Sequence, residues 1–315
     1  MKRDLYLVID IGGTKILLVL FDEDGNIIGR KKLRTPEKPL PEVLVNFILD
    51  SVSEMEHELQ TVFLNSIKAV GICFAGFVEF RQKIVHQAPN LGWQEPVPFA
   101  DLLEKKLKCP VIIENDASAA VLGEVYYGAA RGHHDVIYIT LSTGIGGGLF
   151  LNGQLYRGSS GFAGEIGHTK LFGKDRICSC GGENCLETWA SGSGIAKSAS
   201  ELWEPGDLNY EEFTTANVFA EAAAGNQPAE LIVKEAIKAV GIGLSNLLNI
   251  LNPSCLVIGG GIINAHPELL AELDIIIRCK AIRPVVEISS LKVLQAELGA
   301  DSGIWGIYAL LKGQD

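Results

Sequence analysis

Apolar runs interrupted by glycine and turn residues open the chain. Residues 5–11 (LYLVIDI) and 15–21 (KILLVLF) are strongly apolar with a glycine pair between them, and a DEDG turn separates them from 26–33. Short turns of this kind join antiparallel neighbours. The pattern predicts three strands in a meander.

The period then changes to that of a helix. Over residues 42–60 apolar side chains recur at helical spacing, at Val43, Phe47, Ile48, Val52, Met55 and Leu59. This spacing predicts a helix with one buried face. A strand is predicted at 67–74, a helix near 99–108 and a strand at 110–114.

The opening pattern recurs in the middle of the chain. Residues 135–142 are a predicted strand, 143–147 (TGIGG) a glycine turn, and 148–158 two strands around an Asn-Gly turn. Solenoid repeats have periods of about 20–50 residues, whereas these two copies lie much further apart. They predict two similar α/β domains that face each other.

The last third of the chain predicts a long helix at 230–251 that stops before Pro253, then a strand at 255–261. The apolar face of this helix is expected to hold Leu231, Ile237, Val240, Leu244, Leu247, Leu248 and Leu251. A terminal helix at 301–311 is expected to pack back on the N-terminal domain.

Composition indicates a globular chain and argues against two classes of protein. The 315 residues are 47% hydrophobic and 21% charged, and the net charge of −11 disfavours binding to a phosphate backbone. No apolar run has the length of a membrane span, and the N-terminus lacks an export signal. The expectation is a cytoplasmic protein that binds neither nucleic acid nor membrane.

The seven cysteines fall into two groups. Four lie in apolar surroundings and are expected to be small buried side chains: Cys73, Cys109, Cys255 and Cys279. Cys178, Cys180 and Cys185 cluster after His168. In a cytosolic chain such a cluster favours metal or redox chemistry over disulfides. Because C-x-C matches the redox C-x-x-C pattern poorly, the favoured interpretation is a closed structural Zn²⁺ site.

Two glycine-rich turns are candidates for phosphate binding. DIGGTK (10–15) and STGIGGG (142–148) join strand to strand, so neither is a Rossmann or P-loop fingerprint. Glycines can expose backbone N–H groups to a phosphate, and Asp10 would point a carboxylate at a bound Mg²⁺. One such turn could be a plain hairpin. Two copies and a third cluster at 259–261 favour phosphate binding.

These three elements resemble the two phosphate motifs and the adenosine motif of the sugar kinase, Hsp70 and actin superfamily. Within it the chain resembles the ROK family (repressors, open reading frames, kinases) over nearly its full length. The motifs ENDASAAVLGE (114–124), GEIGH (164–168) and CSCGGENCLE (178–187) carry this resemblance in order and spacing.

The resemblance implies an α/β fold with two actin-like ATPase (ribonuclease H-like) domains flanking a central cleft. Residues 1–116 would form the small domain, with a helix at 300–315 packing back on it. Residues 117–299 would form the large domain, which includes the zinc-binding segment 168–185.

The resemblance also implies the ligands and the residues that hold them. ATP with catalytic Mg²⁺ would be bound by Asp10, Gly12, Gly13, Thr14, Lys15, Thr143, Gly144, Gly259, Gly260 and Gly261. The sugar would be bound by Gly76, Asn90, Asn115, Asp116, Glu165, His168 and Glu187. Structural Zn²⁺ would be held by His168, Cys178, Cys180 and Cys185, with the second ring nitrogen of His168 reaching a sugar hydroxyl.

By position alone, Asp116 could be a helix N-cap as readily as a catalytic base. The resemblance implies the base, which would orient a sugar hydroxyl for attack on the γ-phosphate. Three positions depart from the family pattern: Ala75 replaces a proline, Glu79 an aspartate, and Asn184 a glycine. Asn tolerates positive φ next best after glycine, so the turn at Asn184 should survive.

The function implied is an ATP-dependent hexose kinase acting on the 6-hydroxyl, with glucose as the expected sugar. The alternatives are an N-acetylglucosamine or N-acetylmannosamine kinase and a non-catalytic ROK sugar sensor or repressor. Repressors carry a helix-turn-helix before the first glycine motif, and this motif begins here at residue 10. A homodimer or homotetramer is implied, and use of ATP rather than polyphosphate is left open.

Overall fold

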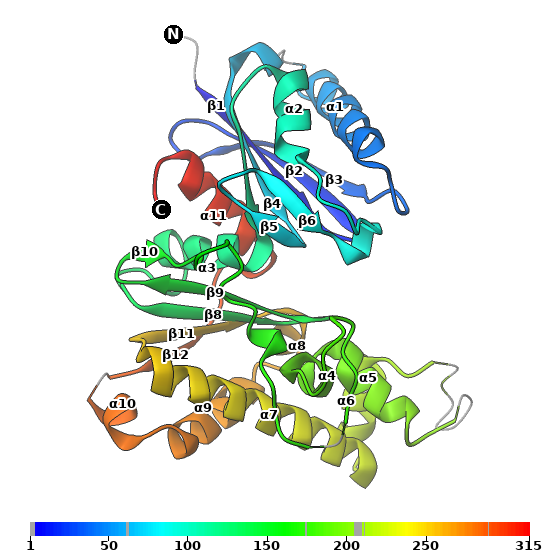
Figure 1. Cartoon of the computed structure of the whole chain (residues 1–315), viewed down its shortest axis with the longest axis vertical. Coiled ribbons are helices and arrows are strands. Elements are labelled where there is room, and N and C mark those ends of the chain that lie inside the picture. The colour runs from blue at the N-terminus through cyan, green and yellow to red at the C-terminus, as the bar shows by residue number, and fades with distance from the viewer. Residues whose placement is uncertain (1–3, 61–62, 174, 205–209, 211, 289) are drawn as a thin grey trace. The chain divides into compact units, whose positions relative to one another are not determined.

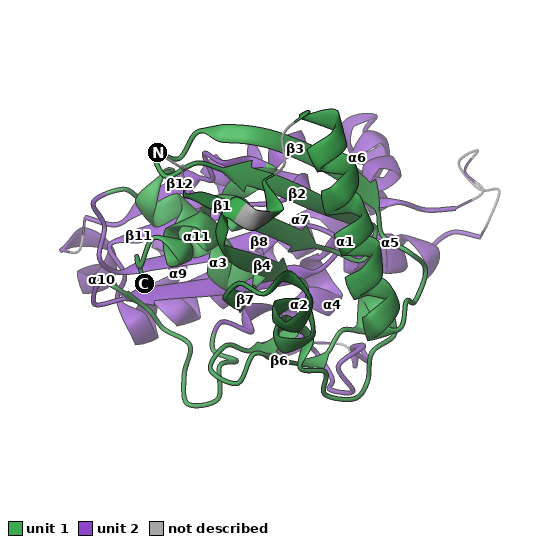
Figure 2. Ribbon diagram, turned by 90° about the horizontal axis from the view of Figure 1, so that it is seen from above, with its two compact units in different colours: residues 1–131, 154–163, 300–315 green, residues 132–153, 164–299 purple. Residues whose placement is uncertain are grey.

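The computed structural model describes residues 4–60, 63–173, 175–204, 210, 212–288 and 290–315. The chain divides into two compact units (Figure 2). Unit 1 comprises residues 1–131, 154–163 and 300–315, and unit 2 comprises residues 132–153 and 164–299. Each unit has its own sheet and helices (Figure 1).

The sheet of unit 1 has the order β3-β2-β1-β4-β7. Its strands are β1 (Leu5–Ile11), β2 (Lys15–Phe21), β3 (Ile27–Arg34), β4 (Ile67–Phe74) and β7 (Val111–Asn115). The first three pair antiparallel, which confirms the predicted meander, and β4 and β7 extend the sheet in parallel. The apolar character of β1 follows because both of its faces are buried.

Helices cover both faces of this sheet. Helices α1 (Pro41–Glu58) and α2 (Phe99–Leu107) share one core with the Leu7 and Ile9 side of β1. On the Tyr6 and Val8 side lie α3 (Asp116–Tyr126) and the returning helix α11 (Ser302–Leu311). The terminal helix thus packs on the sheet of the N-terminal unit. Shorter elements are η1 (Leu64–Ser66), β5 (Phe77–Glu79), β6 (Ile84–Gln87) and η2 (Pro89–Leu91).

The sheet of unit 2 repeats the topology of unit 1. Strands β8 (Val136–Leu141) and β9 (Ile145–Leu151) pair antiparallel, and β11 (Cys255–Gly259) and β12 (Lys292–Gln295) extend from β8 in parallel. The strand directions match those of β1, β2, β4 and β7, so the repeat predicted from the sequence is confirmed. The Asn152–Gly153 turn, with both residues at positive φ, leads into the short β10 (Gln154–Leu155).

The remaining helices belong mainly to unit 2. They are η3 (Ile166–His168), α4 (Leu186–Ala190), α5 (Gly192–Ser200), α6 (Thr215–Ala223), α7 (Gln227–Leu251), α8 (Gly261–Ala265), α9 (Leu269–Lys280) and α10 (Arg283–Glu287), followed by η5 (Gly299–Asp301). Among the described segments, none forms a helix long and apolar enough to cross a membrane.

Several side chains predicted to be buried are exposed. Val43 is 51% exposed because the buried stripe of α1 runs one position later, and Leu231 at the start of α7 is 56% exposed. Cys73 and Cys255 are buried as predicted, but Cys109 is only partly buried and Cys279 is exposed in the last turn of α9. Apolar spacing identifies a helix, but the edge of its buried face depends on the neighbour it contacts.

Glycines set the approach of α3 to α11. A Cβ atom at Gly306 would meet the carbonyl group of Ala119, and one at Gly123 would meet the carbonyl group of Ser302. These atoms belong to helix backbones, which cannot rotate away as a side chain can. The two helices therefore pack at a separation that only glycine allows.

Gly306→Ala is expected to lower the free energy of unfolding by about 1–3 kcal/mol, although alanine favours the helix, because the methyl group forces α11 away from α3. Urea unfolding measures the change. Gly243→Ala in α7 is the matched control, since its new Cβ would meet only the movable Leu186 Cδ2, at 3.0 Å. Equal effects of the two substitutions would contradict the packing argument.

Candidate functional site

Asn115 caps helix α3 and leaves Asp116 at its first turn. The Asn115 Oδ1 atom accepts hydrogen bonds from the backbone N–H groups of Ala117 (2.9 Å) and Ser118 (3.1 Å). Its Nδ2 atom donates to the backbone oxygen of Gly76 at 3.1 Å. The N-cap role that the position of Asp116 allowed therefore belongs to Asn115. The expected contact of Asn115 with a sugar stays a prediction.

Asp10 and Asp116 lie together at the carboxyl edge of the sheet of unit 1. Asp10 is level with Cys73 on β4, and Cys73 is level with Glu114 on β7. Burial, followed by the charge of Asp10, raises the pKa of Asp116 to about 6. Burial also raises the pKa of Asp10, while Lys15 opposes the shift. Two neighbouring, partly buried carboxylates are ligands of the kind that a divalent cation prefers, and a cation between them would offset the effect of Asp10 on Asp116.

The first glycine turn packs on the loop that carries Asn90. A Cβ atom at Gly13 would lie 2.6 Å from the Asn90 Cβ atom, so only glycine permits this approach. The turn is fixed by a 3.0 Å hydrogen bond from the Gly12 N–H to the Lys15 carbonyl. Thr35 donates from Oγ1 to the Gly12 carbonyl at 2.8 Å. Unit 1 thus places its candidate phosphate turn beside a candidate sugar residue.

Unit 2 holds a cavity of about 530 Å³, within the range of small-ligand pockets. Thr143 and Gly261, both predicted from the glycine motifs, line it. The other lining residues are Ser142, Gly192, Ser193, Ala196, Glu212, Phe213, Thr214, Thr215, Ala216, Phe219, Ile262, Ala265 and His266. At one wall the rings of Phe219 and His266 stack with centroids 4.0 Å apart.

Sequence reasoning missed Phe219 and His266. His266 closes α8 directly after the third glycine cluster, which is a local signal, whereas Phe219 lies on α6 with no motif around it. The three glycines 259–261 have different roles. A Cβ atom at Gly259 would meet Ala296 and Tyr138, and one at Gly260 the backbone of Leu141. These two glycines allow close packing, and Gly261 lines the cavity.

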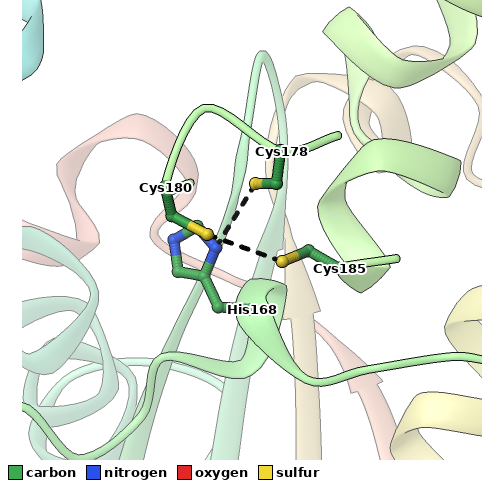
Figure 3. A group of neighbouring side chains, drawn as sticks. All are labelled: His168, Cys178, Cys180 and Cys185. Carbon is green, nitrogen blue, oxygen red and sulfur yellow. Dashed lines mark hydrogen bonds between the residues drawn. The ribbon is translucent and has the colours of Figure 1, made fainter. Parts of the chain in front are cut away.

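The predicted cluster of one histidine and three cysteines is assembled in unit 2 (Figure 3). One ring nitrogen of His168 and the sulfur atoms of Cys178, Cys180 and Cys185 all lie within 4.8 Å of one another. The Cys180 and Cys185 sulfurs are 3.6 Å apart, and Cys178 Sγ lies 3.7 Å from His168 Nδ1. Zn–S bonds of about 2.3 Å at tetrahedral angles place two sulfurs about 3.8 Å apart. The donor set and its spacing therefore fit Zn²⁺.

Local turns bring these four ligands together. Cys185 is the N-cap residue of α4 and pairs with Lys170, two residues after His168. Asn184 adopts a φ of 54°, which confirms that asparagine can take the place of the usual glycine. Its side-chain Oδ1 atom accepts a hydrogen bond from the Arg176 N–H at 3.1 Å and so ties the cysteine loop closed.

The cluster is connected to the second glycine turn. Glu187, two residues after Cys185, accepts a hydrogen bond at Oε2 from the Ile145 N–H (2.9 Å). A Cβ atom at Gly144 would lie 2.6 Å from the same Oε2 atom. With Nδ1 turned to the sulfurs, the His168 Nε2 atom lies 3.8 Å from Glu165 Oε2. Three predicted sugar residues, Glu165, His168 and Glu187, are thus gathered around the cluster in unit 2.

The predicted site residues therefore form two groups, one within each unit. In unit 1 they are Asp10, Gly12, Gly13, Thr14, Lys15, Gly76, Asn90, Asn115 and Asp116. In unit 2 they are Thr143, Gly144, Glu165, His168, Cys178, Cys180, Cys185, Glu187, Gly259, Gly260 and Gly261. Their roles in binding and catalysis stay predictions.

The repeated strand order, with a glycine turn after the first strand of each sheet, defines the actin-like ATPase fold. A family model described as the ROK family matches residues 6–314. The chain belongs to the ROK family.

The chain is similar to a glucokinase of Halalkalibacterium halodurans, at 33% identity over 98% of this chain and 96% of that protein. It is also similar to the xylose repressor of Bacillus subtilis, at 33% identity over 83% of this chain and 65% of that protein. A solved ROK family glucokinase from Streptomyces griseus, in complex with glucose and AMPPNP, matches with a TM-score of 0.79 and 32% identity, covering 97% of this chain and 98% of that one.

Asp116→Asn is expected to raise the free energy of unfolding at pH 8 by up to about 3 kcal/mol. Burial raises the pKa of Asp116 to about 6 from 3.8, so the folded protein holds this proton more tightly than the unfolded chain. Ionisation therefore costs stability as the pH rises through about 6, and the cost is absent below about 4.

Urea unfolding of both proteins at pH 5 and pH 8, without magnesium, measures this difference. Asp50→Asn is the control, since it removes a carboxylate on the exposed side of α1, outside the site. The interpretation of Asp116 is wrong if the gap between Asp116→Asn and the wild type does not widen at pH 8.

Proposed function

We propose that the chain is an ATP-dependent hexose kinase that transfers the γ-phosphoryl group to the 6-hydroxyl of glucose. The observation that carries the proposal is the pair Asp10 and Asp116 at the edge of one sheet, in a chain that aligns with glucokinases from end to end. A cation site next to a poised carboxylate is what phosphoryl transfer to a hydroxyl requires.

In this mechanism Asp116 orients the hydroxyl and accepts its proton. A carboxylate with a pKa of about 6 is ionised at neutral pH yet basic enough to take a proton as the hydroxyl attacks. Asp10 would hold Mg²⁺, which supplies charge neutralisation on the transferred phosphoryl group when bound. The N–H group of Gly13, in the first glycine turn, would face the phosphates. The cavity lined by Thr143 and Gly261 would take the nucleoside.

The residues proposed to recognise the sugar are Asn90, Asp116, Glu165, His168 and Glu187. Their carboxylate and amide groups can bond two hydroxyls each, and the second ring nitrogen of His168 can bond one. The similarity to glucokinases favours glucose. An N-acetylglucosamine or N-acetylmannosamine kinase is the alternative, since it would use the same groups.

A repressor function is the candidate from another class, because xylose repressors match at similar identity. One observation favours catalysis. Asp10, Asp116 and Thr143, which a sensor does not need for chemistry, are all present at the glycine turns or at the start of α3.

We also propose that His168, Cys178, Cys180 and Cys185 hold Zn²⁺ as a structural ion. With no position left open among four ligands, the ion would order the loop and not act on the substrate. Through Cys185 and α4 it would fix Glu187 on the second glycine turn. A homodimer or homotetramer and a cytoplasmic location are further parts of the proposal.

The first test measures ADP release with Mg·ATP and glucose, mannose, N-acetylglucosamine, N-acetylmannosamine, allose or fructose. Turnover should be highest on glucose, and kcat should fall as the pH drops through about 6, because Asp116 then takes up a proton. Asp116→Asn should lower kcat by about 10²–10⁴-fold. Preference for an N-acetylated sugar would contradict glucose as the substrate and support the N-acetylglucosamine or N-acetylmannosamine kinase. Absence of turnover on every sugar would refute a hexose kinase acting on this panel.

Removing the metal tests the zinc site. A strong chelator should lower the thermal unfolding temperature and raise the KM for the sugar together, because the loop that carries Glu187 loses its cross-link. Cys180→Ser should lose bound zinc, whereas Cys279→Ser, at an exposed cysteine outside the cluster, should retain it. A metal-free protein with unchanged stability and KM would show that the cluster needs no ion.

A further inference from the structure

Directly before the cap of α3 lies a buried ion pair. The Glu114 side chain is 1% exposed, and its Oε2 atom accepts a 2.7 Å hydrogen bond from Arg157 Nε. The other carboxylate oxygen, Oε1, accepts a 2.9 Å hydrogen bond from the backbone N–H of Asn115. One carboxylate therefore connects Arg157 to the residue that caps α3 and immediately precedes Asp116.

The orientation of Arg157 is fixed on three sides. Its guanidinium carbon lies 4.1 Å from the centre of the Phe80 ring, within cation–π range. Its Nη1 atom donates to both carboxylate oxygens of Asp315 at 2.9 Å. Only 17% of the side chain is exposed, so most of the group is packed against neighbouring atoms. Arg157, Glu114, Phe80 and Asp315 all belong to unit 1.

The contacts form a continuous path to Asp116. Arg157 holds Glu114, Glu114 holds the Asn115 N–H, and Asn115 caps α3 through Ala117 while also bonding Gly76. Each step is a hydrogen bond of normal length, and two of them involve a charged partner, which makes them stronger and more directional.

We propose that Arg157 is a positioning residue for phosphoryl transfer, acting through Glu114 and the Asn115 cap to hold the Asp116 carboxylate in its reactive orientation. The inference rests on the proposed role of Asp116. It goes beyond the sequence motif, because Arg157 lies in a separate segment of the chain, 154–163, outside ENDASAAVLGE.

Stability alone gives a weak reason for such a pair. A buried ion pair is commonly matched or exceeded in stability by neutral side chains of similar volume. A neutral pair could close this part of unit 1, but it would fix the orientation of the side chain at position 114 less firmly. The ion pair instead specifies one geometry at the residue where a misplacement of about 1 Å can cost 10²-fold in rate.

Without the guanidinium group, Glu114 would be either protonated or ionised, and the two states would differ in their effect on the cap. Burial raises the pKa of Glu114, and Arg157 is the largest influence that lowers it. Asp315 and Cys73 are further titratable groups that interact with Glu114. Without Arg157, a protonated Glu114 can stay in place and still accept from Asn115. An ionised Glu114 must turn towards water and release the cap.

The experiment compares Arg157→Met, Glu114→Gln and the double variant Arg157→Met/Glu114→Gln with the wild type between pH 6.5 and pH 9. Arg157→Met should lose about 100-fold in kcat at pH 9 and much less at pH 6.5, with the KM for ATP unchanged. In the double variant the amide side chain at position 114 cannot ionise and can still accept from Asn115. Its kcat relative to wild type should therefore be independent of pH and higher than that of Arg157→Met at pH 9.

Two further variants distinguish a loss of positioning from a folding defect. Arg157→Lys keeps the charge but not the planar fork, so kcat should be intermediate and the loss should not grow with pH. Asp315→Asn leaves the contact with Glu114 intact and should keep kcat within about twofold of wild type. Thermal unfolding of each variant gives the folded fraction by which kcat is corrected.

Equal pH dependence of Arg157→Met and the double variant, or wild-type kcat in Arg157→Met, would overturn the inference. Asp116→Asn is measured in parallel. If Asp116→Asn is inactive while Arg157→Met has wild-type kcat at every pH, only the positioning role fails. If Asp116→Asn retains full activity, the proposed catalytic role of Asp116 fails, and the positioning role fails with it.

Discussion

The candidate site depends on the parallel register of β1, β4 and β7. Parallel strands end at one edge of a sheet, and the register places Asp10, Cys73 and Glu114 side by side there. Because α3 starts directly after β7, Asp116 comes to the same edge. The apolar body of the sheet buries these carboxylates in part, and this burial raises the pKa of Asp116. The same register therefore determines both the position and the chemistry of the aspartates.

In unit 2 a different interaction holds the glycine turn in place. Its sheet repeats the topology of unit 1, but the second glycine turn is held by a carboxylate from a short helix, Glu187 of α4. The segment from Gly164 to Cys185 has little regular structure of its own, since η3 is its only named element among the described residues. Short segments of this kind have too small a core to fix side chains. The sulfur and imidazole groups gather there, and the proposed Zn²⁺ would supply the missing constraint, because it would join His168 to the residue that starts α4.

The sequence predicted most of the fold and also the four residues of the histidine and cysteine cluster. The fold and the cluster were predictable for different reasons. Strands, helices and the internal repeat follow from periods of two and 3.6 residues and from glycine turns, which are local signals. The four metal-type ligands were predicted because cysteine and histidine rarely cluster without a purpose. Val43 and Cys279 were misplaced because burial is decided by packing partners distant in sequence. Phe219 carries no motif, so only the fold could bring it to His266.

Asn115 and Asp116 have different roles at the start of α3, and only the structure distinguishes them. By position alone, either residue could cap the helix. The structure gives the cap to Asn115, and Asn115 in turn depends on Glu114 and Arg157. Three carboxylates, those of Asp10, Glu114 and Asp116, lie around the start of α3.

The guanidinium of Arg157 is committed to one of these carboxylates, that of Glu114. The charge of Asp10 therefore still raises the pKa of Asp116, and Lys15 only partly offsets the burial of Asp10. The positive charge that would complete the balance is the one that a magnesium nucleotide brings. In the proposed mechanism the site would therefore be most favourable electrostatically with such a substrate bound, because the cation would neutralise Asp10 and Asp116, and the charge of Asp10 opposes the ionisation of Asp116.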